Sequence, residues 1–136
     1  MEFELLNLKS EFLRELINEI QRVEITLWDC LKYNNKKEIP NKLDYMQKLI
    51  LDSLKILNES SVEVALFYLG KTQNACLIEK ELKKLYIIIE KQKESLTEIE
   101  NIPENKIILI LDANKSNPME FSQSSQKISY MLSLFE

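Results

Sequence analysis

The sequence has no histidine, and it contains little glycine, proline, cysteine or arginine. Histidine is the usual general base of enzymes and a principal zinc ligand. Without it the chain cannot form a Ser-His or Cys-His catalytic pair, an HExxH zinc site, the His-x-Glu site of deaminases or the ExxH motif of ferritin-like bundles. HEPN-type ribonucleases, whose motif also needs histidine, are excluded on the same ground.

A single glycine, Gly70, stands among 136 residues. P-loops and GxGxxG turns need several glycines, so both are excluded. The tight turns of β-sandwiches and barrels also consume glycine. We therefore predict an all-α fold, a single-domain helical bundle over residues 1–136. We expect about five to six helices, a long central helix around residues 75–100, and no substantial sheet.

The only cysteines are Cys30 and Cys76, and they form no CxxC motif. Two isolated cysteines cannot build a structural zinc site. We expect both to be buried free thiols, with a single disulfide as the minor alternative. The longest aliphatic runs, such as residues 107–111, are too short to span a bilayer, and Met-Glu-Phe-Glu at the start lacks the basic region of a signal peptide. A cytoplasmic protein is the expectation.

Apolar residues at steps of three and four predict two helices in the first part of the chain. The first covers residues 4–31, and its apolar stripe is widened by Phe12 and Trp28. The second covers residues 41–58. Asn41 is the predicted N-cap of this helix, because its side-chain oxygen can accept a backbone N–H of the first turn.

The stretch from residue 60 to residue 100 lies within the longest run without proline. Ser60 and Glu63 have the spacing of a capping box, which predicts a helix start. We expect a break at Gly70, near residues 70–74, because an uninterrupted helix of about 40 residues would exceed the usual globular length. Residues 85–89 are apolar on every side of a helix, so we expect them to be buried on more than one face.

Residues 107–111 fit either a strand or a short buried helix. A lone strand in a helical bundle would leave unpaired edges, so the helix is the preferred prediction. Pro103 is expected at the first position of that helix. Asn117 and Pro118 predict the start of a last helix.

Charge is distributed unevenly along the chain, which has 22 acidic and 18 basic residues and a net charge of −4. Residues 2–24 and 94–105 carry an excess of acids, whereas residues 32–55 and 71–93 carry an excess of lysines. The fold can therefore present an acidic end and a basic end, although a mixed solvated surface is the simpler interpretation. The sequence has only two arginines, and duplex DNA readers rely on arginine, so duplex DNA is not an expected partner.

Carboxylates are the remaining route to catalysis. The α-helical, magnesium-dependent pyrophosphatases place acids three residues apart, and no Glu or Asp here has an acid at that spacing. Acids four residues apart do occur, and we interpret them as solvated helix faces. We therefore expect no enzyme activity, no catalytic residues, no cofactor and no metal.

Three functions remain as hypotheses. The first is a non-enzymatic protein-binding module, most concretely an acidic immunity- or inhibitor-type protein that neutralises a basic partner protein. The second is a small helical subunit of a larger assembly, self-associating as a homodimer or contacting a nucleic acid backbone through lysines. The third, least favoured, is a carboxylate and magnesium enzyme. The residues predicted to contact a partner are Glu94, Glu98, Glu100, Glu104, Lys80, Lys83, Lys84 and Ile87.

Overall fold

The structure, a computed structural model, describes residues 2–68, 70 and 72–111 of the chain. Its α-helices are α1 (Glu2–Lys32), α2 (Ile39–Leu57), α3 (Ser60–Tyr68), α4 (Thr72–Ser95) and α5 (Glu104–Leu111). Two short 3-10 helices, η1 (Lys36–Glu38) and η2 (Ile99–Asn101), lie in the connections. These ranges contain no strand, and the all-α prediction is confirmed. The helix predicted from Pro118 lies outside the described residues.

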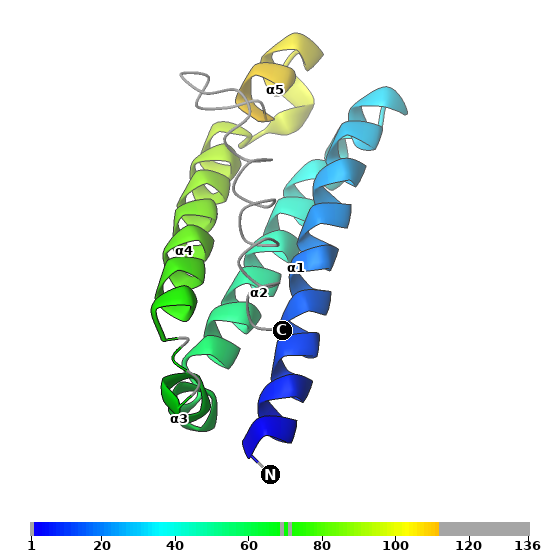
Figure 1. Cartoon of the computed structure of the whole chain (residues 1–136). Helices are drawn as coiled ribbons and strands as arrows, with labels where there is room; N and C mark the ends of the chain where they lie inside the picture. The colour runs from blue at the N-terminus through cyan, green and yellow to red at the C-terminus, as the bar shows by residue number, and fades with distance from the viewer. Residues whose placement is uncertain (1, 69, 71, 112–136) are drawn as a thin grey trace.

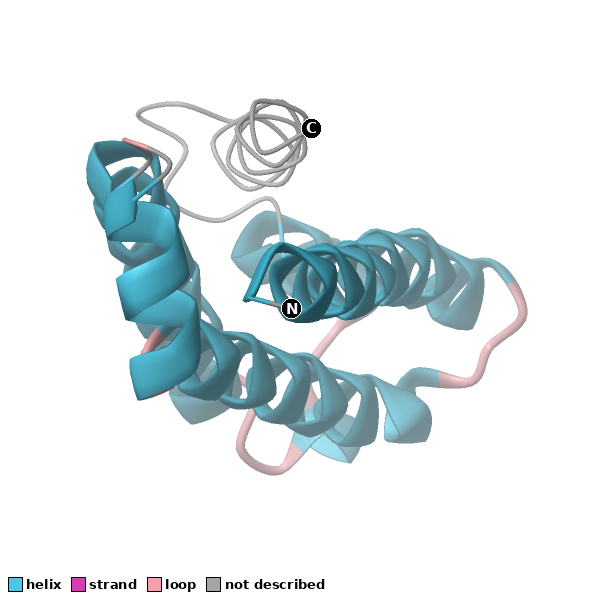
Figure 2. Ribbon diagram, turned by 60° about the horizontal axis from the view of Figure 1, so that its bottom comes forward, coloured by secondary structure: helices cyan, strands magenta, loops and turns pink. Residues whose placement is uncertain are grey.

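Three long helices lie side by side, with α2 between α1 and α4 (Figure 1). Each runs antiparallel to its neighbour. The short helix α3 is seen end-on in Figure 1, at the end of the bundle where α2 finishes and α4 begins, and α5 lies at the opposite end. Figure 2 shows the same helices from a viewpoint closer to their axes.

One hydrophobic core joins all five α-helices, α1 to α5, of the described residues. It is built from the predicted apolar stripes, and its fully buried members include Ile17, Leu43, Leu85 and Ile107. The stripe on α1 is narrower than predicted, because the side chains of Phe12 and Trp28 are 51% and 39% exposed. A position one residue beside the stripe is turned about 100° away from it, so those rings lie at the edge of the core.

The predicted N-cap of α2 is wrong. This helix begins at Ile39, and Pro40 occupies its first turn, where the missing N–H costs nothing. Glu38 is the residue at the N-cap, and its side chain makes no capping hydrogen bond. Asn41 therefore lies inside the helix. The sequence places the start too late because a proline that follows a polar run is typical both of a loop and of the first turn of a helix.

Two other helix starts are displaced by one residue. The N–H of Glu63 donates to the carbonyl oxygen of Glu59 at 3.0 Å, so Ser60 is the first residue of α3 and not its cap. At α5 the carbonyl oxygen of Pro103 accepts from the N–H of Ile107 at 3.1 Å, so the proline precedes the helix. The short helix predicted over residues 107–111 is confirmed.

The predicted break at Gly70 is confirmed, since α3 ends at Tyr68 and α4 begins at Thr72. Gly70 has a φ of +68°, in the left-handed region that helix-ending glycines favour. A Cβ atom added there would meet nothing within 4 Å. Glycine is therefore needed for its backbone conformation and not for space.

We predict that Gly70→Ala lowers the free energy of unfolding by about 1 kcal/mol, since alanine in the left-handed region is strained even where there is room. Gly70→Asn, which tolerates this region better, should cost less. Urea denaturation followed by circular dichroism measures both. Equal losses for the two variants would contradict the explanation.

Gln92 attaches α5 to α4. Its side chain is 3% exposed, and its Nε2 donates to the carbonyl oxygens of Leu111 at 3.2 Å and Ile110 at 3.5 Å. Carbonyls in the last turn of a helix have no partner within the helix, so this amide satisfies two of them. The Oε1 atom of Gln92 is buried and accepts no hydrogen bond from the described residues.

We predict that Gln92→Glu destabilises the protein by about 2–4 kcal/mol at pH 8, because a buried carboxylate would face two carbonyl oxygens. Burial raises the folded-state pKa of the new carboxyl above its unfolded value of about 4.3. The defect should therefore be smallest below about pH 4 and grow as the pH rises through the folded pKa. Melting curves of the wild-type protein and of Gln92→Glu at several pH values measure this loss of stability. Gln73→Glu, at an exposed position of α4, is the control and should show no such growth.

Candidate functional site

The eight predicted contact residues fall in two places. Four of them, Lys80, Lys83, Ile87 and Glu94, follow one another along α4 at steps of three, four and seven residues. Such steps place side chains on one helix face. All four are exposed, and we call this surface the α4 outer face. Lys84 is also exposed and lies beside it.

The predicted burial of residues 85–89 on more than one face does not extend to Ile87. Leu85, Ile88 and Ile89 are buried, whereas Ile87 is 55% exposed. Of the three long helices, α4 is the one farthest from α1, with α2 between them (Figure 1). Neither α1 nor α2 therefore covers the α4 outer face. The apolar ring therefore leaves one aliphatic side chain in contact with solvent.

The acidic residues after α4 meet lysines that precede α2. The Nζ of Lys36 donates to the carbonyl oxygens of Glu100 at 3.0 Å and Ile102 at 3.3 Å. The Nζ of Lys37 lies 3.5 Å from the Oε1 of Glu100. The two kinds of charge are therefore mixed at this end of the bundle, as in the simpler interpretation of the sequence, because η1 and η2 bring them together.

Glu98 and Glu104 are exposed and make no ion pair within the described ranges. Glu98 is in the left-handed region, with a φ of +58°, where the chain leaves α4 and turns into η2. Glu104 borders a cavity of about 260 Å³ beside Cys30, Asn34 and Lys36. These acids belong to the end of the bundle and not to the α4 outer face.

We predict that Lys36→Met costs about 1–2 kcal/mol of stability, because two backbone carbonyls lose a charged donor. Lys37→Met should cost at most about 0.5 kcal/mol, since its ion pair is exposed. Chemical denaturation of the two variants measures the difference. Equal losses of stability in the two variants would show that Lys36 is not the main link between the connections that contain η1 and η2.

A polar network that the sequence did not predict fastens α2 to α4. Lys93 forms an ion pair with Asp44 and donates to the Oε1 of Gln47 at 2.8 Å. The Nε2 of Gln47 donates to the Oε2 of Glu90 at 2.7 Å. Gln47 is 5% exposed, and its only signal in the sequence is a polar residue four positions after Leu43, within an apolar stripe.

The hydrogen bond that Lys93 donates to the carboxylate of Asp44 raises the pKa of Lys93, against the opposing effect of partial burial. A raised folded-state pKa contributes stability that is complete below the ordinary lysine pKa of about 10.5 and is lost as the pH rises above it. At neutral pH this ion pair therefore contributes fully.

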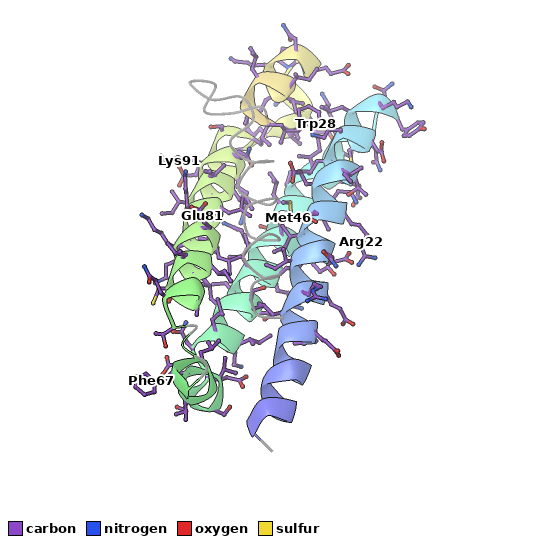
Figure 3. All side chains as sticks on the ribbon, in the orientation of Figure 1. Arg22, Trp28, Met46, Phe67, Glu81 and Lys91 are labelled. Carbon is purple, nitrogen blue, oxygen red and sulfur yellow. The ribbon has the colours of Figure 1, made fainter. Side chains whose placement is uncertain are left out.

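The cysteines are both free, and only one is buried as predicted. Burial raises the pKa of Cys30, which keeps its thiol protonated and unreactive at neutral pH. Cys76 is exposed, so the prediction for it is wrong. It borders a cavity of about 240 Å³ between α3 and α4, next to Phe67, which projects away from the bundle (Figure 3).

A groove of about 420 Å³ lies between α1 and α2, lined by Arg22, Thr26, Lys42 and Tyr45 among others. The guanidinium of Arg22 is held by Glu19, with Nη2 and Oε2 2.9 Å apart. Nowhere in the described part of the chain do three or more His, Cys, Asp or Glu side chains gather as metal ligands would. Within the same part, none of the helices combines the length and apolar character needed to cross a membrane.

Comparisons with known proteins gave no match: no family model fits the sequence, no curated protein resembles it, and no solved structure resembles its fold. Function is therefore inferred from the residues of this chain.

Proposed function

We propose that this protein is a non-catalytic protein-binding module whose contact surface lies on the outer side of α2 and α4. The observation that carries the proposal is a pair of exposed aliphatic side chains on these adjacent helices. Ile87 on α4 is 55% exposed and Leu51 on α2 is 51% exposed. Single exposed aliphatic residues are common, but a pair within a charged surround has the anatomy of an interface.

The polar network supports placing the two side chains together. It sets Asp44 opposite Lys93 and Gln47 opposite Glu90 in antiparallel helices. One turn further along α2 is Leu51, and one turn back along α4 is Tyr86. Leu51 is therefore expected beside Tyr86, next to Ile87.

A neutralising or immunity-type role is the form of binding that we favour. An inhibitor acts by covering its partner, so it needs a rigid surface and no chemistry of its own. Here the surface lies on two helices that are packed into the core. The surface therefore keeps its shape before binding, which limits the entropy lost on association. The net negative charge of the whole chain supports a partner whose net charge is positive.

The test is to place a photoreactive side chain at position 87, as Ile87→p-benzoyl-phenylalanine, and to irradiate cells of the native host. We expect one discrete adduct with another protein. The same change at Ile25, a 64% exposed isoleucine on α1, is the matched control and should give none. The partner, once purified, should bind the wild-type protein at a one-to-one ratio.

Ile87→Ser should weaken that binding about tenfold or more while changing stability by less than about 0.5 kcal/mol, since the side chain is exposed. Ile25→Ser should leave the affinity unchanged. Adducts at both positions, or adducts that disappear after nuclease treatment, would contradict the proposal. An adduct only with a second copy of this chain would replace the partner by a homodimer.

A further inference from the structure

We propose that the surface around Ile87 and Leu51 takes an acidic amphipathic helix of a partner protein. The inference rests on the proposed function and adds the chemistry of the partner. It depends on which charged side chains near Ile87 and Leu51 form ion pairs or hydrogen bonds within the protein and which do not.

Three acids that border this surface already have hydrogen-bond or ion-pair partners within the protein. Asp44 is paired with Lys93, and Glu90 accepts from Gln47 at 2.7 Å. Glu79 is paired with Lys83, whose Nζ lies 3.0 Å from its Oε1. These carboxylates are therefore partly neutralised before any partner arrives.

Several lysines on the same surface have no such partner. In the part of the chain that the structure describes, no ion pair or hydrogen bond engages the ammonium groups of Lys48, Lys55, Lys80 and Lys91, all of which are exposed. Figure 3 shows Lys91 projecting from the side of α4 that is turned away from α2. Two exposed acids, Asp52 beside Leu51 and Glu94 on the α4 outer face, also form no ion pair with any described residue, so four such lysines stand against two acids. The unpaired charge around the aliphatic pair is thus positive, although the whole chain is negative.

The lysines surround the aliphatic pair. On α4, Lys80 and Lys91 lie one to two turns to either side of Ile87. On α2, Lys48 and Lys55 lie one turn to either side of Leu51. A ligand that fills this surface therefore needs an apolar centre and negative charge on both sides of it.

An amphipathic helix has this arrangement, because residues three and four apart form an apolar stripe with charged residues beside it. Two packed helices can also receive the side-chain ridge of a third helix between their own ridges. Acidic residues beside the stripe would reach the lysines, which raises the association rate and makes binding sensitive to salt. A nucleic acid backbone would use the lysines but gain nothing from Ile87 and Leu51.

The test is selection of helical peptides from a random phage-displayed library on the full-length protein. We expect the enriched peptides to be strongly acidic and to carry aliphatic residues three or four positions apart. The best peptide, made synthetically, is then measured by fluorescence anisotropy. Ile87→Ser and the double variant Lys80→Glu/Lys91→Glu should each weaken its binding about tenfold or more.

The matched control is Lys32→Glu/Lys106→Glu, which reverses two exposed lysines on other helices and should change the affinity less than about twofold. Enriched peptides that are basic or uncharged, yet depend on Ile87, would overturn the acidic-helix inference and leave the protein-binding function intact. The inference would also be overturned if no peptide were enriched, or if Ile87→Ser left the peptide affinity unchanged. The cross-linking experiment at position 87 tests the protein-binding function separately.

A single-stranded oligonucleotide is measured in parallel. Oligonucleotide binding that is lost in the lysine double variant but kept in Ile87→Ser, with no peptide binding of the expected kind, would assign the surface to nucleic acid and overturn the inference.

Discussion

The rest of the bundle depends on the burial of α2 between two antiparallel neighbours. Ile39, Leu43, Met46 and Ile50 are completely buried along it, and each aliphatic side chain removed from water contributes roughly 1.5–3 kcal/mol. Apolar contacts are not directional, however, and allow neighbouring helices to slide. The network of Gln47 with Glu90 and Lys93 adds directional bonds at one height of the α2–α4 contact. It thereby fixes which exposed residues of the two helices become neighbours.

Periodicity predicted most of the fold because it reports which side chains share a helix face. Two predictions rest on other arguments: the break at Gly70 follows from backbone preference and the usual length of a helix, and the helix over residues 107–111 from the unpaired edges that a lone strand would have. Helix starts were less predictable. Asn41 and Ser60 have good capping chemistry, but the backbone begins each helix elsewhere, and a cap is decided by hydrogen-bond geometry that the sequence does not contain.

The candidate site was only partly predictable for a related reason. A helix face is apolar or polar in the sequence, but the neighbour that covers it is known only from the fold. Ile87 belongs to an apolar ring and still faces solvent. Glu100 belongs to an acidic run and is bound by Lys36 and Lys37, which are about 60 residues away in the sequence. Long-range charge pairing of this kind changes the surface potential that composition alone would indicate.

This pairing also determines the kind of partner that each surface suits. Net charge describes attraction at distances beyond about 10 Å, where individual charges are averaged and screened. At contact distance the unpaired groups decide, because a paired carboxylate has already satisfied its strongest hydrogen bonds. A molecule with an acidic total charge can therefore present a basic contact surface, as the lysines around Ile87 and Leu51 do. For the partner that we propose, long-range charge and contact chemistry would therefore select different properties: a positive overall charge that draws it near, and an acidic helix that fits the surface.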